Sequence, residues 1–350
     1  MDRLLIFTQL TLGMIGVLGV AASEPDLWPR QLGNLMVGLV IVWGVSRFSP
    51  KTITKLSPYA YLILLFLLVL VLFIGVSPTG SESRRWLPLP FGTVQPSEFM
   101  KVTVIAYLTA FFYNHLGDWH IWRPMFVIGI AAGLIILEPN VSTALFIFAL
   151  CFAIMIAAGT SLFRLMSITT AAAIITLLFA MPYLSQYPYV QGRLEAWRDA
   201  RGPQEDSHGG SFQTLQAQRT LQRAGFFGIG PGRPFHVPEA DTDMVSVSIA
   251  HSLGLTGIIT LIGLYLIVAG RGISIAAALS GPGSLLAAGA TIYICAQAGL
   301  NLLVASGLVP ITGVVLPFVS YGFNSLVSVA IAMGFLHSAY RQGRREGVCT

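Results

Sequence analysis

The sequence predicts an all-α polytopic membrane protein with about ten transmembrane helices. Hydrophobic residues make up 55% of its 350 residues, while Asp, Glu, Lys and Arg make up only 10%. About a quarter of the residues are charged in a typical soluble domain, and the mean hydropathy here is +0.74. Apolar runs approaching the ~20 residues that cross a bilayer recur along the whole chain.

The apolar runs give the expected helices in order. Because the first run follows one Arg and one Asp and is itself followed by further runs, we expect a retained helix rather than a cleaved signal peptide. We expect residues 1–350 to form one transmembrane domain, with residues 182–244 as a long extracytoplasmic loop between the seventh and eighth helices. The expected spans are 5–22, 32–46, 59–76, 98–113, 124–137, 143–158, 163–181, 245–269, 284–306 and 325–340.

Positive charge in the short loops predicts the orientation, because cytoplasmic loops are enriched in Lys and Arg. If the N-terminus is inside, the inner loops and termini hold Arg3, Arg47, Lys51, Lys55, Arg123, Arg164, Arg271, Arg341, Arg344 and Arg345. The outer short loops hold Arg30, Arg84 and Arg85. Both termini are therefore expected in the cytoplasm. The net charge of +5 follows mostly from this bias and does not indicate a nucleic-acid partner.

Several kinds of site find no signal in the sequence. Cys151 and Cys295 fall in expected helices and Cys349 in the tail, without the spacing of metal ligands. Neither a GxxxxGK[ST] phosphate loop nor a GxSxG nucleophile elbow occurs, so we expect no nucleotide cofactor.

The first charged pair inside an expected helix lies in QPSEFMK. Pro96 suits a helix start, and Glu98 and Lys101 are three residues apart, so they share a helical face and can pair. The pair either holds helices together or lines a polar cavity, since charge in the hydrocarbon region is costly. Arg84 and Arg85 precede it at headgroup height, where they would bind anionic membrane lipid or a substrate pyrophosphate.

The stretch LEPNVSTA, residues 137–144, predicts a tight outer hairpin between the fifth and sixth helices. Pro139 and Asn140 interrupt a helix, and Asn140, Ser142 or Thr143 can cap the next one. Glu138 is expected at the membrane interface.

The long outer loop contains an Arg-rich and Gln-rich stretch. Phe212, Leu215 and Leu221 alternate with polar residues in a way that favours a short amphipathic helix on the membrane surface. The following GFFGIGPG, residues 225–232, either aims backbone N–H groups at a phosphate or forms a flexible turn.

Three acids, Glu239, Asp241 and Asp243, crowd the start of the eighth apolar run. In one interpretation Asp241 or Thr242 caps the helix and the acids complement its dipole. In the other, Asp243 sits at the mouth of a cavity with its pKa raised by desolvation, as a general base acting on a sugar hydroxyl requires. The spacing alone leaves both open.

Five segments together resemble the SEDS family, which includes RodA and FtsW. They are RRWL…QPSEFMK, LEPNVSTA, FQTLQAQ…AGFFGIG, PEADTD and NLLVASGLVPITGVVLPFVSYGFNSL, in the family's order and over nearly the whole chain to about Arg345. The resemblance implies a multi-pass protein of the bacterial cytoplasmic membrane that polymerises lipid II into peptidoglycan strands for elongation or division. It also implies a class B penicillin-binding protein as partner and a divalent cation, Mg²⁺ or Mn²⁺.

The resemblance assigns roles to individual residues. Asp243 matches the essential catalytic aspartate, and Glu98 and Lys101 match the paired charges of the QPSE-x-x-K helix. Arg193 matches a basic position before the Gln-rich segment of the outer loop, and Gln213 matches the glutamine of the family's YQ pair. With these residues and the charged pair, the expected substrate cavity also includes Arg84, Arg85, Glu239, Ser320 and Tyr321. The signature before the last helix is matched by Pro310, Gly313, Pro317, Ser320, Tyr321 and Gly322.

The chain departs from the family pattern at several positions. Asp241 stands where the family usually has His, and Asn140-Val141-Ser142 where it has Asp-Leu-Gly. His251-Ser252 replaces a pair of glutamates, and Phe323-Asn324 replaces Gly-Ser. Two other functions remain open: a flippase or transporter that uses Glu98, Lys101 and Asp243 along a translocation path, or a catalytically weak scaffold of the elongation or division complex.

Overall fold

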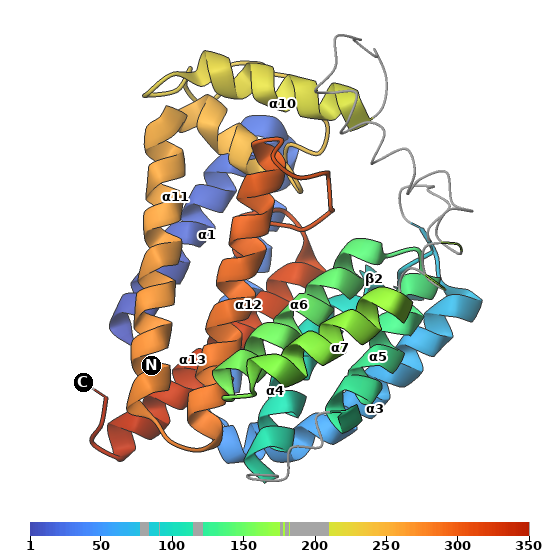
Figure 1. Ribbon diagram of the computed structural model, residues 1–350. Helices are drawn as coiled ribbons and strands as arrows, with labels where there is room; N and C mark the ends of the chain where they lie inside the picture. Colours follow the sequence, from blue (N-terminus) through green and yellow to red (C-terminus); the bar gives the residue numbers. More distant parts are fainter. Residues whose placement is uncertain are drawn as a thin grey trace. The chain divides into compact units, whose positions relative to one another are not determined.

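The computed structural model describes residues 1–77, 84–90, 92–114, 122–175, 178, 182 and 210–349 (Figure 1). A 3₁₀ turn, η1 (Pro25–Leu27), joins the first two helices. The α-helices are α1 (Arg3–Ser23), α2 (Trp28–Ser46), α3 (Pro50–Ile74), α4 (Pro96–Asn114), α5 (Trp122–Leu137), α6 (Val141–Ala157), α7 (Leu162–Ile175), α10 (Gly210–Ala224), α11 (Val245–Ala278), α12 (Pro282–Ala305) and α13 (Phe323–Arg345).

The predicted class, an all-α polytopic membrane protein, is confirmed. Each of the predicted spans overlaps a helix, and α1, α3, α11, α12 and α13 are long and apolar enough to cross a membrane. The helices α5 and α6 are apolar but shorter. The number of crossings, the single transmembrane domain and the extent of the outer loop stay predictions, and residues 183–209 of that loop lie outside the described residues.

Helix starts follow the local sequence. The Asp2 side chain accepts a hydrogen bond from Leu5 N at 3.0 Å and caps α1. The Ser49 hydroxyl accepts from Thr52 N at 3.1 Å, with Pro50 at the first position of α3. Pro96 begins α4, as predicted, because a residue without an N–H loses nothing in a first turn.

A small β-hairpin precedes α4 and was not predicted. Strands β1 (Leu87–Leu89) and β2 (Gly92–Val94) pair antiparallel, with Leu87 opposite Val94. Strands of three residues are too short to show the two-residue periodicity by which strands are recognised.

The described chain divides into two compact units. The first comprises Met1–Val42, Pro188–Arg271 and Ile294–Ala330, and the second comprises Trp43–Tyr187, Gly272–Tyr293 and Ile331–Thr350. In the second unit α3 packs on α4 and α5, and α6 packs on α4 and α5. The helix α4 is buried on nearly all sides, with Met100, Ile105 and Leu108 at its core.

Contacts near the chain ends agree with the predicted orientation. In the first unit Arg271 Nε lies 2.7 Å from Asp2 Oδ2, which places two segments expected in the cytoplasm side by side. In the second unit the Ser338 hydroxyl donates to the carbonyl of Phe48 at 2.6 Å, and the Arg341 guanidinium donates to the carbonyl of Arg47. All of these residues lie in or beside the positively charged loops and termini.

Candidate functional site

The candidate site of the first unit is built on an irregular segment between α12 and α13. Residues 306–322 are not helical, so their backbone groups need partners from elsewhere if apolar surroundings exclude water. Buried side chains of the neighbouring helices supply these partners. Asn301 Nδ2 donates to the carbonyl of Val314 at 2.8 Å, and Gln297 Nε2 donates to that of Val315 at 3.1 Å. The Tyr265 hydroxyl donates to the carbonyl of Pro317 at 2.7 Å, and Gln31 Nε2 donates to that of Val319 at 3.3 Å.

This segment and α12 hold the turn that carries the three acids. The carbonyl of Asp241 accepts from Tyr321 N at 2.8 Å, and that of Thr242 accepts from the Ser320 hydroxyl at 2.6 Å. The carbonyl of Asp243 accepts from Asn301 Nδ2 at 2.8 Å. Three successive carbonyls are therefore fixed, and with them the position from which the Asp243 side chain leaves the backbone.

Asn301 is the hub of this arrangement. It is fully buried, and its amide nitrogen donates both to Asp243 and to Val314. Its amide oxygen lies 3.3 Å from the Ser246 hydroxyl in the first turn of α11. Both donors and one acceptor of the side chain are thus used, which leaves little freedom to rotate. The sequence analysis missed Asn301, although an amide pair at i and i+4, Gln297 and Asn301, inside an apolar run is a usable signal.

The expectation that Asp241 or Thr242 caps the eighth helix is wrong. The helix α11 begins at Val245, so the residue at its N-terminal boundary is Met244. The Thr242 hydroxyl donates instead to Glu239 Oε2 at 2.7 Å. The Met244 N–H donates to the carbonyl of Glu239. The backbone at Glu239 has a φ of 56°, which reverses the direction of the chain. The acids therefore lie in a tight turn before the helix.

Burial affects the acids of this turn unequally. Desolvation raises the pKa of the Asp241 carboxyl, and the negative charges of Glu239 and Glu24 raise it further, against the lowering effect of backbone hydrogen bonds. Asp243 is partly buried and Glu239 is exposed. The raised pKa expected for Asp243 stays a prediction.

The predicted amphipathic helix is confirmed as α10, and part of its apolar face packs on protein. Ala217 is buried in a cluster with Val237, Ala240 and Met244, and Leu221 packs against the same cluster. The Gln213 side chain donates to the carbonyl of Pro238 at 3.2 Å. Figure 1 shows α10 lying across the end of α11. This helix therefore covers the turn that carries Asp243, and its contact with the membrane surface stays a prediction.

The glycine-rich stretch after α10 packs on a break in α11. Gly254 has φ 67° and ψ −157°, which interrupts the span predicted to be continuous from 245 to 269. The N–H groups of Leu255 and Thr256 donate to the carbonyls of Gly225 and Phe226 at 3.0 and 3.1 Å. These bonds favour an ordered strap over the flexible turn considered from the sequence.

The second unit contains the predicted pair in α4. Lys101 Nζ lies 2.7 Å from Glu98 Oε1, and the two side chains are 4% and 12% exposed. The ammonium also lies 5.6 Å from the ring centre of Phe146 in α6 and 5.8 Å from that of Tyr293 in α12. The pair is confirmed, and its cation joins three helices through cation–π contacts. A place in a substrate cavity stays a prediction.

The hairpin between α5 and α6 is also confirmed, with one correction. Asn140 stands at the N-cap of α6 but makes no capping side-chain bond, and its Nδ2 lies 3.4 Å from Ser97 Oγ. Glu138 is 1% exposed and therefore buried in protein, while its place at the membrane interface stays a prediction. Desolvation raises the pKa of its carboxyl to about 8, although the nearby charge of Arg85 lowers it in part. Arg85 Nε donates to the Glu138 carbonyl at 3.2 Å.

The predicted site residues therefore fall into two groups. Gln213, Glu239, Asp243, Ser320 and Tyr321 come together in the first unit, and Arg84, Arg85, Glu98 and Lys101 belong to the second. The Ser320 hydroxyl makes two hydrogen bonds to the backbone, since it donates to the Thr242 carbonyl and accepts from Leu316 N at 2.8 Å. Arg193 lies outside the described residues. Within the described ranges, no group of three or more His, Cys, Asp or Glu side chains is placed to hold a metal ion.

Comparisons with known proteins agree with this architecture. Residues 4–345 match the FtsW/RodA/SpoVE model, described as cell cycle protein. The chain is 31% identical to the probable peptidoglycan glycosyltransferase FtsW of Coxiella burnetii, over 96% of this chain and 95% of that protein. It is also 31% identical to stage V sporulation protein E of Bacillus subtilis, over 98% of both.

Solved structures show the same fold. A chain of the structure described as "Structural coordination of polymerization and crosslinking by a peptidoglycan synthase complex" matches with a TM-score of 0.81 and 26% identity, over 97% of this chain and 98% of that chain. The rod shape determining protein RodA of Thermus thermophilus matches with a TM-score of 0.71 and 23% identity, over 97% of both chains. The chain therefore belongs to the FtsW/RodA/SpoVE family of cell cycle proteins.

Proposed function

We propose that the protein is a peptidoglycan glycosyltransferase that polymerises lipid II at the outer face of the bacterial cytoplasmic membrane. Membership of the family supports this proposal, as do the names of its relatives. The observation that carries it furthest is the turn at Asp243, whose three successive carbonyls are held by Asn301, Ser320 and Tyr321. A general base must be held in a fixed place relative to the proton that it removes.

In the proposed reaction the Asp243 carboxylate accepts the proton of the 4-hydroxyl on the acceptor's GlcNAc. That oxygen forms a bond to the anomeric carbon of the donor's MurNAc from the face opposite the leaving group. The bond from this carbon to the undecaprenyl pyrophosphate oxygen breaks, and the pyrophosphate leaves with the electron pair. The configuration at the anomeric carbon is therefore inverted.

The turn supports this chemistry through rigidity. Asp241 is held by its carbonyl, and the raised pKa of its side chain reflects a partly desolvated environment beside Asp243. We assign Glu239 to the lip of the turn, because it is exposed and bound to Thr242. The resemblance implies a divalent cation, Mg²⁺ or Mn²⁺, but the described residues supply no three-ligand cluster of His, Cys, Asp or Glu side chains for it.

We further propose a class B penicillin-binding protein as the partner. The similar chain with a TM-score of 0.81 belongs to a structure described as a peptidoglycan synthase complex. A transpeptidase that crosslinks the new strands is the activity that such a complex adds to polymerisation.

Transport of a lipid-linked precursor is the alternative. It would use Glu98, Lys101 and Asp243 along a path through the membrane. The side chains of Glu98 and Lys101 are already paired at 2.7 Å, and Lys101 also contacts two aromatic rings. A structural role therefore explains both charges without a transported solute, which favours glycosyl transfer.

Proteoliposomes that contain the purified protein and its penicillin-binding partner separate the two functions. Fluorescent lipid II is added, glycan length is read on a gel, and lipid movement is read by quenching. The proposal expects polymer that grows with time. Lipid movement between leaflets without chain growth would replace the proposed function by transport.

A further inference from the structure

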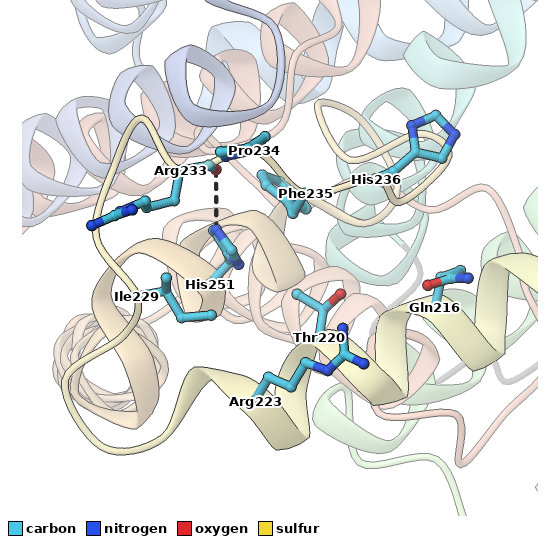
Figure 2. A pocket seen from close by; sticks show the side chains of 9 residues that line it. All are labelled: Gln216, Thr220, Arg223, Ile229, Arg233, Pro234, Phe235, His236 and His251. Carbon is cyan, nitrogen blue, oxygen red and sulfur yellow. Dashed lines mark hydrogen bonds between the residues drawn. The ribbon is translucent and has the colours of Figure 1, made fainter.

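A cavity in the first unit lies beside α10. It has a volume of about 330 Å³, at the lower end of the range for small-ligand sites. Figure 2 shows Thr220 and Arg223 of α10 on one side and His251 of α11 with Phe235 on the other. Its lining residues are Gln216, Thr220, Arg223, Ile229, Arg233, Pro234, Phe235, His236 and His251. The proposed chemistry at Asp243 uses none of them.

All ionisable side chains of this lining are basic. Arg223, Arg233 and His236 are exposed, and His251 is buried. None of the nine lining residues, all in the described part of the chain, is an Asp or Glu. Gln216 and Thr220 add neutral hydrogen-bond donors. A concave site lined by positive charge focuses the electric field and so attracts anions.

The buried ring of His251 forms the floor of the cavity. Its side chain is 4% exposed, and its Nε2 lies 3.2 Å from the carbonyl of Arg233, to which it donates. The ring stacks on Phe235 with centroids 4.4 Å apart. Nδ1 is buried and has no hydrogen-bond partner among the described residues. Figure 2 shows this nitrogen on the side of the ring that faces Thr220 and Ile229.

The break in α11 holds this floor in place. Ile229 N donates to the carbonyl of His251 at 2.7 Å, so the glycine-rich strap is bonded to the residue whose ring enters the cavity. Gly228 and Gly254 touch backbone to backbone, since a Cβ on Gly228 would stand 2.6 Å from Gly254 N. The backbone that carries the His251 ring is therefore held by the strap.

We propose that this cavity binds a phosphate-class anion. Arg223 and Arg233 would neutralise its charge, and His251 Nδ1, which has no partner among the described residues, would form a hydrogen bond with the ligand. Guanidinium groups suit phosphate oxygens because they offer paired N–H donors. The volume exceeds that of one phosphate, so the ligand is a diphosphate or a phosphate that carries a polar substituent. Such groups come from a lipid headgroup or from a free diphosphate, and the test below separates them.

The test uses the full-length protein in phosphatidylcholine nanodiscs. Inorganic pyrophosphate is titrated at constant ionic strength by calorimetry, and native mass spectrometry compares retained phosphatidylglycerol with phosphatidylcholine. Arg223→Gln removes an exposed charge of the cavity without disturbing the core. His251→Gln keeps a donor for the Arg233 carbonyl but removes Nδ1. Arg219→Gln is the matched control, because it removes the same charge from α10 outside the cavity lining.

We expect each cavity variant to weaken binding of at least one probe by about tenfold, which is the effect of losing one hydrogen bond to a charged group. Arg219→Gln should change it by less than about twofold, because this exposed charge is screened by salt and does not line the cavity. Asp243→Ala should bind as the wild type does, so failure of the proposed chemistry would not alter this result. Pyrophosphate binding identifies a diphosphate ligand, and selective phosphatidylglycerol retention identifies a lipid. Binding of neither probe, or equal binding by Arg223→Gln, His251→Gln and Arg219→Gln, would overturn the proposal.

Discussion

Replacing Asn301 with leucine tests how the Asp243 turn is held. The two side chains are similar in size, but leucine offers no donor to the carbonyls of Asp243 and Val314. A buried polar group left without its partner costs ~1–3 kcal/mol. The Val314 contact is buried and the Asp243 contact is partly buried, so we expect a loss of about 2–5 kcal/mol from the free energy of unfolding.

Activity should fall further than stability explains. Without Asn301 the Asp243 carbonyl loses its clamp, and the carboxyl moves relative to the sugar hydroxyl. A misplacement of about 1 Å can cost ~100-fold in rate. Thermal unfolding in detergent measures the first effect. Glycan synthesis from lipid II, measured well below the unfolding midpoint, measures the second.

Gln297→Leu is the matched control. Gln297 also donates to the irregular segment, through the carbonyl of Val315 at 3.1 Å and the Ser325 hydroxyl at 3.3 Å, but no contact described here joins it to the turn of Asp243. It should lose comparable stability while the folded protein keeps most of its activity. Equal loss of activity in the two folded variants would show that Asn301 does not position Asp243.

Three further predictions concern other parts of the fold. Gly254→Ala should lower the free energy of unfolding by about 2 kcal/mol or more, because residue 254 has φ 67° and an added Cβ would meet the backbone of Phe226 and Gly228. Chemical denaturation measures this loss. Gly263→Ala is the control, because a Cβ there enters open space on the same helix. The pKa of Glu138 is raised from 4.5 to about 8, so the folded state keeps a proton that the unfolded state loses, and the free energy of unfolding should fall as pH rises between these values. Glu138→Gln should flatten that slope in melting curves, and an unchanged slope would contradict the assignment. Glu98→Gln should lower the free energy of unfolding by about 3–5 kcal/mol, because it leaves the Lys101 charge buried without its partner. In a double-mutant cycle, adding Lys101→Met to Glu98→Gln should recover most of this loss. Additive losses would show that the two side chains are not coupled.

Much of the fold could be predicted because membrane helices are encoded locally. Each expected span contains enough apolar residues to be recognised, and Pro96 marks the start of α4 through its own missing N–H. The pair of Glu98 and Lys101 was predictable for the same reason, since three residues on a helix bring two side chains together.

The rest depends on contacts between segments that are distant in the sequence. The Thr242 hydroxyl had a plausible local role as a cap, but Ser320 and Tyr321, almost eighty residues away, fix the turn in another conformation. The break at Gly254 is likewise compensated by the carbonyls of Gly225 and Phe226. The hydrophobic periodicity of α11 does not reveal these two carbonyls as hydrogen-bond partners. The burial of the Glu138 carboxyl also depends on packing that its local sequence does not encode.

The assignment of the base can be decided by comparing two isosteric variants, Asp243→Asn and Asp241→Asn. Both keep the shape of the turn, but only Asp243→Asn removes the proposed proton acceptor, while Asp241→Asn removes the neighbouring acid with the raised pKa. The rate of glycan formation from lipid II is measured with the partner present and with folding checked by melting. We expect a loss of at least ~100-fold for Asp243→Asn and a smaller loss for Asp241→Asn. Polymerisation by Asp243→Asn at the wild-type rate would show that Asp243 is not the base.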